Sequence, residues 1–331
     1  MFSVASPKLA AAVTNSGGFG VIGGVSYTPE LLREALKELK SYLVDKNAPF
    51  GVDLLIPKVG GNARKTNYDY SHGKLGELIE IIIESGAKLF VCAVGIPPKW
   101  AVDRLHQGGV LYMNMIGHPK HALKAVEVGA DLICAQGGEG GGHTGDVPTI
   151  ILIPAVAELL RDKISPFTGR QVALVAAGGI HNGQSLAAAL MLGAGAVWVG
   201  TRFILSEESG ASRAHQQALQ EAGFDDIIRT TIYTGRPLNT QATPYIRRWE
   251  DERKQEMKDL QNKGIIPLAH DMETKKDDDE VLDNAYPVLM GKVAGMVRER
   301  LPAKAIVEQM VDEAAELLEA GGKSVSLVSK L

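Results

Sequence analysis

Residues 172–180 read VALVAAGGI and residues 193–203 read GAGAVWVGTRF. Each stretch contains a short apolar run that ends in glycine. Short, continuous runs of Val, Ala and Leu are typical of strands that are buried on both faces of a parallel sheet. The two stretches therefore predict consecutive parallel strands, and the fold class follows from how this pattern recurs along the chain.

The pattern is repeated over the first 205 residues, where helical segments separate successive apolar runs. The predicted strands are residues 19–23, 50–55, 88–94, 110–116, 131–135, 172–177 and 196–199. The predicted helices are residues 29–43, 74–85, 98–106, 120–128, 148–161 and 183–192. Repeated strand–helix units of this kind form either a doubly wound sheet or a (β/α)8 barrel, the TIM barrel.

The start of the chain favours the barrel. Residues 6–16, SPKLAAAVTNS, read as a helix with Ser6 as its N-cap and Pro7 at the first helical position. A helix at this point implies a preceding strand, for which only residues 1–5 are available. We therefore expect an α/β fold of the TIM-barrel type, with a first strand that is short or missing.

The alternation of strands and helices stops after Leu205, and the rest of the chain differs in character. We expect residues 1–205 to form the barrel core and residues 206–331 to form a helical, charged extension that packs on the barrel. Residues 206–223 look helical. The densely charged residues 247–280 are expected to be a solvated helix and loop, or else the arm of a homodimer. Residues 302–320 have apolar side chains at helical spacing.

Composition excludes several classes of protein. The chain has 331 residues and a net charge of −4, which gives no reason to expect a nucleic-acid partner. Cys92 and Cys134 lie inside predicted strands and have no CxxC partner, so we expect two buried free thiols. No spacing of His, Cys, Asp and Glu indicates a metal site.

The chain shows no membrane or secretory signal. No apolar run approaches the ~18 residues of a membrane span, and no basic segment precedes an apolar one at the N-terminus. The last residues, Ser329, Lys330 and Leu331, match a peroxisomal address. The expected location is therefore peroxisomal in a eukaryote and cytoplasmic otherwise.

The glycines that end the two late strands predict a phosphate site. In a TIM barrel, phosphate often binds at the loops after the last two strands. Those loops contain Gly178 and Gly179 after one strand, and Gly200 and Thr201 after the next. Glycine exposes backbone N–H groups to an oxyanion, and Thr201 adds a hydroxyl donor. The alternative is that these glycines only close tight turns.

One histidine lies in a glycine-rich loop that follows a predicted strand. Residues 137–146 read GGEGGGHTGD, and ordering so many glycines is costly in entropy unless the loop wraps a ligand. His143 is therefore the candidate general base or acid. Glu139 and Asp146 flank it and are candidates to orient it. Weaker candidates to line the same pocket are His118 and His181.

Several stretches together resemble the nitronate monooxygenase family, formerly the 2-nitropropane dioxygenases, which is related to flavin-dependent enoyl-acyl-carrier-protein reductases. The resemblance covers nearly the whole chain. Its carriers are SPKLAAAVTNSGGFGVIGG at 6–24, GVDLL at 51–55, EGGGHTGD at 139–146, AAGGI at 176–180, GAGAVWVGTRF at 193–203 and VLMGKVAGMV at 288–297.

The resemblance implies a barrel that binds FMN and no metal. It implies that Gly178, Gly179, Gly200 and Thr201 hold the FMN phosphate and that His143 is the catalytic base near flavin N5. Three further cofactor-binding positions follow from the resemblance. Met1 matches a methionine whose backbone faces the flavin, Asp53 stands where many members have asparagine, and Gln136 stands where relatives often have an acidic residue.

The implied activity is oxidation of alkyl nitronates or nitroalkanes by O2 to carbonyl compounds and nitrite. His143 would remove the α-proton when the substrate is a neutral nitroalkane. Two alternatives stay open at this point. One is an NAD(P)H-dependent FMN reductase of enoyl thioesters or quinones, and the other is a barrel without flavin that acts as a binding protein.

Overall fold

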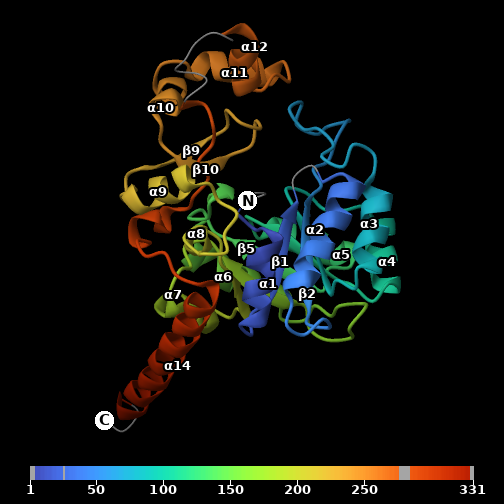
Figure 1. Ribbon diagram of the computed structural model, residues 1–331, viewed down its shortest axis with the longest axis vertical. Coiled ribbons are helices and arrows are strands. Elements are labelled where there is room, and N and C mark those ends of the chain that lie inside the picture. Colours follow the sequence, from blue (N-terminus) through green and yellow to red (C-terminus); the bar gives the residue numbers. More distant parts are fainter. Residues whose placement is uncertain (1–3, 25–26, 276–283, 329–331) are drawn as a thin grey trace.

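The core of the computed structural model, which describes residues 4–24, 27–275 and 284–328, is a curled sheet of seven parallel strands (Figure 1). The strand order is β1-β2-β3-β4-β5-β7-β8. The bounds are Gly20–Gly24 (β1), Phe50–Leu55 (β2), Leu89–Ala93 (β3), Leu111–Ile116 (β4), Leu132–Gln136 (β5), Ala173–Ala177 (β7) and Ala196–Trp198 (β8). Each strand pairs with its neighbour in parallel, as the continuous apolar runs predicted.

Helices alternate with these strands and cover the outside of the curled sheet. Their bounds are Pro7–Asn15 (α1), Pro29–Tyr42 (α2), Leu75–Glu84 (α3), Lys99–Gln107 (α4), Lys120–Val128 (α5), Thr149–Leu160 (α6) and Gly183–Met191 (α7). Ser6 caps α1 as predicted, since its hydroxyl oxygen accepts a hydrogen bond from Leu9 N at 3.2 Å. The predicted fold of the TIM-barrel type is therefore confirmed. None of the described helices combines the length and the apolar character that crossing a bilayer requires.

The two outer strands of the sheet, β1 and β8, face each other across an apolar cleft of about 340 Å³. Phe19 and Val21 line one side, and Val197 and Phe203 line the other. The first strand that the sequence analysis placed within residues 1–5 falls largely outside the described residues, which begin at Val4. Helix α1 and the C-terminal helix α14 (Ala303–Val328) pack together at this opening.

The chain after β8 builds a lobe above the C-terminal ends of the barrel strands (Figure 1). A small antiparallel sheet has the order β6-β10-β9, and β6 comes from the glycine-rich loop. The elements are Gly142–His143 (β6), Thr201–Ile204 (α8), Arg213–Glu221 (α9), Ile227–Thr230 (β9), Leu238–Gln241 (β10), Pro244–Asp251 (α10), Lys254–Asn262 (α11), Pro267–Thr274 (α12) and the 3-10 helix Lys292–Met296 (η1). The sequence did not predict this sheet, and the helix expected over 206–223 is formed only over α9.

The charged segment is also more than a solvated helix and loop, so that expectation is wrong for α10 to α12. These helices have a core of their own around Trp249, which is fully buried. The Arg253 guanidinium lies 3.5 Å from the centroid of the Trp249 ring and pairs with the buried Asp271 at 2.7 Å. The charges therefore act partly inside the lobe, which a count of charged residues does not reveal.

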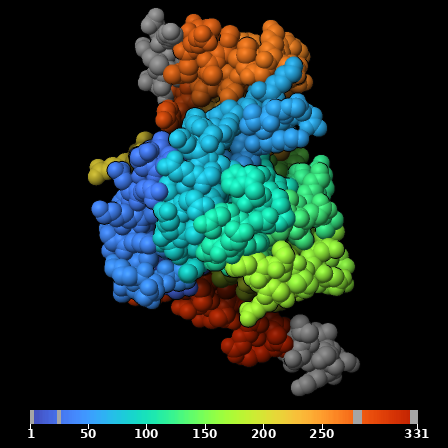
Figure 2. Space-filling view, turned by 90° about the vertical axis from the view of Figure 1, so that its right-hand side faces the viewer, coloured from blue at the N-terminus to red at the C-terminus, as the bar shows by residue number. Residues whose placement is uncertain are grey.

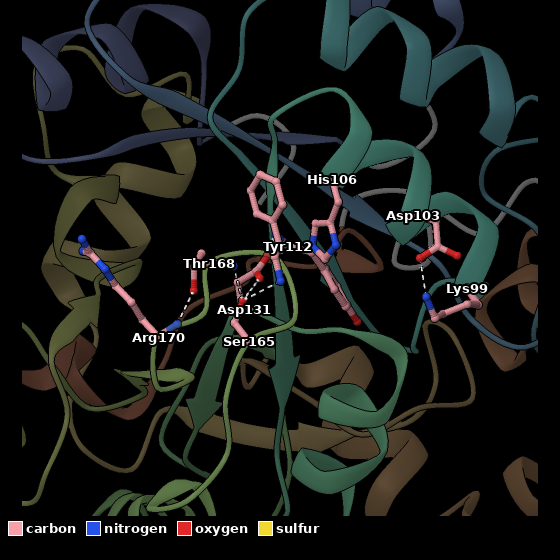
Figure 3. A network of polar contacts seen from close by, with 9 residues as sticks. Lys99, Asp103, His106, Tyr112, Asp131, Ser165, Thr168 and Arg170 are labelled. Atoms are coloured by element: carbon pink, nitrogen blue, oxygen red, sulfur yellow. Dashed lines mark hydrogen bonds and ion pairs between the residues drawn. The ribbon is translucent and has the colours of Figure 1, made fainter.

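A polar network holds the opposite end of the barrel together, at the N-terminal ends of the strands (Figure 3). The Asp131 carboxylate accepts hydrogen bonds from the Ser165 hydroxyl at 2.5 Å and from Tyr112 N at 2.7 Å. It also lies 2.9 Å from His106 Nε2, and the His106 ring stacks on Phe167. The serine donates to the carboxylate and not to the histidine, so it is not an activated nucleophile. This network therefore serves stability, as expected at this face.

Candidate functional site

A cavity of about 420 Å³ lies at the C-terminal ends of the barrel strands, within the size range of pockets that hold small ligands and cofactors. Its walls combine strand ends, the glycine-rich loop and residues of the lobe. The predicted site residues that line it are Asp53, Gln136, His143, Gly178, Gly179, Gly200 and Thr201. Met1 and the C-terminal residues 329–331 lie outside the described residues. No group of three metal-binding side chains occurs in the part of the chain that the structure describes.

The ends of β7 and β8 offer a set of hydrogen-bond donors. Gly178 and Gly179 have φ angles of +88° and +76°, and a Cβ at Gly178 would lie 2.8 Å from the Gly137 carbonyl oxygen. Among the described residues, the N–H groups of Gly179 and Gly200 have no hydrogen-bond acceptor. The Thr201 hydroxyl oxygen accepts from a backbone N–H at 2.9 Å, and its own proton has no acceptor there. Free donors of this kind suit an anionic group.

The glycine-rich loop is held in place by the lobe. Within it, His143 in β6 pairs with Leu238 of β10, so the histidine is fixed by a strand from far along the sequence. The amide of the buried Asn239 donates to the carbonyls of Gly138 and Gly140, at 2.8 and 2.7 Å. The loop that carries the candidate base is therefore braced on its outer side.

His143 is neutral over most of the pH range. Burial, with a smaller contribution from the charge of Arg236, lowers its pKa to about 4. Its Nε2 lies 2.8 Å from the Thr234 hydroxyl oxygen, and this contact fixes the ring. A neutral imidazole held in a cavity can accept a proton from a bound molecule.

Neither flanking carboxylate orients His143, so that expectation is wrong. Glu139 accepts hydrogen bonds from Thr149 N at 3.0 Å and from its hydroxyl at 2.7 Å, at the start of α6. Asp146 is 86% exposed and pairs with Arg229 at 3.3 Å. The partner of His143 comes from a loop of the lobe, 91 residues along the chain.

The two weaker histidine candidates do not line the cavity. His118 is exposed, and its Nδ1 accepts from Lys120 N at 3.2 Å at the start of α5. His181 follows the phosphate-type turn, and its Nδ1 is buried without a hydrogen-bond partner among the described residues. His215, which the sequence did not single out, does line the cavity and bonds the Leu289 carbonyl oxygen at 2.9 Å.

Asp53 on β2 is a second titratable group at the cavity. Its Oδ1 is enclosed and has no hydrogen-bond partner among the described residues. Burial raises its pKa to about 7, so the carboxyl group keeps its proton to a much higher pH than an exposed aspartate does. Gln136 on β5 lies across the cavity, with its amide nitrogen a long 3.5 Å from the Gly141 carbonyl oxygen.

Aromatic side chains that the sequence analysis missed form the outer wall of the cavity. The rings of Tyr68 and Tyr70 lie 4.1 Å apart, and Tyr233 has a buried hydroxyl without a partner among the described residues. These tyrosines come from loops, whose positions have no periodic signal in the sequence. Aromatic residues make up only 5% of the chain, so each tyrosine is uncommon, but the sequence does not show that three of them line one cavity.

The backbone is strained at one point of the same rim. Val94 follows β3 and lines the cavity with a φ of +69°, although it is β-branched. This conformation costs ~1–3 kcal/mol and is found mainly at functional sites. The strain therefore points to the same cavity as the histidine and the free donors.

Comparison with known proteins agrees with this arrangement. Residues 1–313 match the nitronate monooxygenase family. A nitronate monooxygenase of Pseudomonas aeruginosa is 32% identical, over 71% of this chain and 73% of that protein. The (3aS,4S,5R,7aS)-5-hydroxy-7a-methyl-1-oxo-octahydro-1H-indene-4-carboxyl-CoA dehydrogenase of Mycobacterium tuberculosis is 34% identical over 75% of this chain, which spans only 62% of that protein.

The fold has solved counterparts as well. The structure of FabK from Thermotoga maritima superposes with a TM-score of 0.77 at 27% identity, covering 98% of this chain and 93% of that one. The barrel, the cavity at its C-terminal face and the match over 1–313 give one conclusion. The chain belongs to the nitronate monooxygenase family, as its sequence motifs indicated.

Proposed function

We propose that this oxidoreductase is an FMN-dependent nitronate monooxygenase that converts alkyl nitronates and nitroalkanes, with O2, into carbonyl compounds and nitrite. The observation that carries the proposal is a largely buried, neutral His143 in the same cavity as backbone N–H groups that have no acceptor among the described residues. Membership of the nitronate monooxygenase family supports the same reaction class.

The residues present fit FMN. Gly178, Gly179, Gly200 and Thr201 would hold its phosphate, because the N–H groups of Gly179 and Gly200 and the hydroxyl proton of Thr201 have no acceptor among the described residues. The enclosed Asp53 Oδ1 lacks a partner, which a polar atom of the ring would supply. When bound, FMN supplies the electron-accepting chemistry that the side chains of this cavity lack.

His143 would serve as the base for neutral substrates. A nitroalkane must lose its α-proton before it can be oxidised, whereas a nitronate has already lost it. The neutral imidazole accepts that proton, and the contact with Thr234 holds the ring toward the cavity.

The purified protein should be yellow, with a flavin absorption band, and His143→Gln should separate the two substrates. We expect the variant to lose ~10²–10⁴-fold in kcat/KM on nitroethane and far less on ethyl nitronate. The matched control is His118→Gln, which removes an exposed histidine outside the cavity. Equal losses on both substrates would assign His143 to binding, and a colourless protein that takes up no FMN would end the proposal.

One observation favours a second candidate function. The Mycobacterium tuberculosis relative named above is a dehydrogenase of a CoA thioester, at 34% identity. An NAD(P)H-dependent oxidoreductase of thioesters would use the same cavity. Anaerobic bleaching of the bound flavin by NADH or NADPH, followed by recovery of the colour with an enoyl thioester, would support this candidate. An unbleached flavin would exclude it.

A further inference from the structure

Two arginines, Arg64 and Arg236, lie on two loops that pack together beside the cavity, residues 56–74 and residues 231–237. Tyr68, Tyr70 and Thr234 of these loops line the cavity, and the arginines lie behind that lining. Arg64 Nη1 donates to the Gly235 carbonyl oxygen at 3.2 Å, and Arg236 Nε donates to Asn67 Oδ1 at 3.1 Å. The contact between the loops is close, because a Cβ on Gly235, which has a φ of +69°, would lie 2.1 Å from Thr66 Oγ1. Each guanidinium therefore reaches across to the opposite loop.

The lobe keeps the first of these loops in place. Lys65 Nζ donates to the Asn262 carbonyl oxygen at 2.8 Å, at the end of α11. Figure 2 shows the blue segment that contains residues 56–74 directly beneath the orange helices of the lobe. The two arginines are thus part of a braced contact between barrel and lobe.

The charge of this arginine pair is unbalanced. In the described ranges no Asp or Glu forms an ion pair with Arg64 or Arg236. The acidic residue in the same loop, Asp69, uses its carboxylate oxygens on Ser71 N and Gly73 N, at 2.8 and 2.7 Å. Burial, and then the charge of Arg64, lowers the pKa of Arg236. Two like charges held together in this way are stabilised by an anion.

The arginine pair lies next to residues that line the cavity. Arg236 N lies 3.3 Å from the hydroxyl oxygen of Thr234, the residue that contacts His143. The charge of Arg236 also lowers the pKa of His143, so the two groups are close enough to interact. Tyr68 and Tyr70, in the loop that carries Arg64, line the cavity itself. A ligand that extended outward from His143 past these tyrosines would therefore come close to the two arginines.

We propose that Arg64 and Arg236 bind a phosphate group at the end of a substrate or cosubstrate that is remote from its reacting atoms. This inference deepens the second candidate function, the NAD(P)H-dependent oxidoreductase of thioesters, and rests on it. A phosphate carries about −1.5 to −2 charge at pH 7, which balances two guanidinium groups, and guanidinium matches phosphate oxygens in two-point contacts. The phosphate comes either from a coenzyme A thioester or from a nicotinamide nucleotide.

Inorganic pyrophosphate is the simplest probe, titrated by calorimetry into the FMN-loaded protein so that the FMN cradle is occupied. We expect Arg64→Gln and Arg236→Gln each to weaken its binding by about 10- to 100-fold. The control is Arg170→Gln, which removes an exposed guanidinium at the opposite face of the barrel (Figure 3) and should bind as the unaltered protein does. Equal affinities for all four proteins, or no binding by any, would overturn the proposal.

The two sources of phosphate are distinguished by repeating the titration with coenzyme A and with NADPH. A loss confined to coenzyme A in the two arginine variants identifies a thioester substrate, and a loss confined to NADPH identifies a nucleotide. If Arg236→Gln fails to fold, Arg236→Lys keeps the charge without the two-point contact and should retain intermediate affinity. Pyrophosphate binding needs no nitronate turnover, so a failed oxidation assay and a failed arginine site are separate results.

Discussion

Asp53→Asn should change how the stability of the folded chain depends on pH. In the folded protein, burial raises the pKa of Asp53 from 3.8 to about 7. Between these values only the unfolded chain gives up the proton, so the free energy of unfolding falls as pH rises and is level above pH 7. At 1.36 kcal/mol for each pH unit, the fall amounts to at most about 4 kcal/mol, since water entering the cavity reduces it.

His143 acts in the opposite direction over nearly the same range. Its pKa is lowered from 6.5 to about 4, so below pH 6.5 the unfolded chain gains a proton that the folded chain lacks. The free energy of unfolding therefore rises between pH 4 and 6.5, by about 3 kcal/mol. In the unaltered protein the effects of Asp53 and His143 on the free energy of unfolding largely cancel as pH changes. In Asp53→Asn only the effect of His143 remains, so the free energy of unfolding rises with pH.

The assay is urea unfolding at pH 4.5, 5.5, 6.5 and 7.5, at constant ionic strength and without added flavin. We expect the stability of Asp53→Asn relative to the unaltered protein to increase by about 3 kcal/mol from pH 4.5 to 7.5. Asp162→Asn, which removes an exposed carboxylate, should show a difference that does not vary with pH. A constant difference for Asp53→Asn as well would mean that Asp53 ionises normally, and would refute the reasoning.

Three further outcomes follow from the geometry. The kcat/KM for a nitroalkane should stay level as pH is lowered to about 5 and fall only near pH 4, where His143 protonates; a fall centred at pH 6.5 would contradict this. Val94→Asn should raise the free energy of unfolding by about 1 kcal/mol in urea titrations, because asparagine tolerates positive φ. Arg253→Met should lower it by about 3 kcal/mol, because the buried Asp271 loses its closest cation and keeps only Lys275, at 3.5 Å, and the Tyr245 hydroxyl, whereas Arg229→Met, at an exposed pair, should cost less than ~1 kcal/mol.

The barrel could be predicted because its signals are local. The apolar run before Gly178 and the cap at Ser6 each depend on neighbours within a few residues, and both elements form where expected. The lobe sheet could not be predicted, because β6 is two residues long and too short to show a period of two. Its existence depends on pairing between residues about 95 positions apart, such as His143 with Leu238.

Some residues of the candidate site could likewise be predicted from the sequence, and others could not. Glycine at 178 and 179 and histidine at 143 stand out along the chain, since glycine in a turn and a histidine in a glycine-rich loop are features of short segments. Thr234 and Arg236 do not stand out, because nothing near them in the sequence indicates that they adjoin His143. The flanking Glu139 was the more obvious partner by position and is used elsewhere.

Residue types and their spacing were enough to specify a parallel barrel, a turn with free N–H donors and a histidine beside it. These follow from backbone preferences that act over a few residues. Three-dimensional packing was needed to show that burial lowers the pKa of His143 and raises that of Asp53, and that Arg64 and Arg236 lie on adjoining loops beside the cavity. Protonation and charge balance depend on which groups surround an atom and on how much water reaches it, and both are set by contacts between distant parts of the chain.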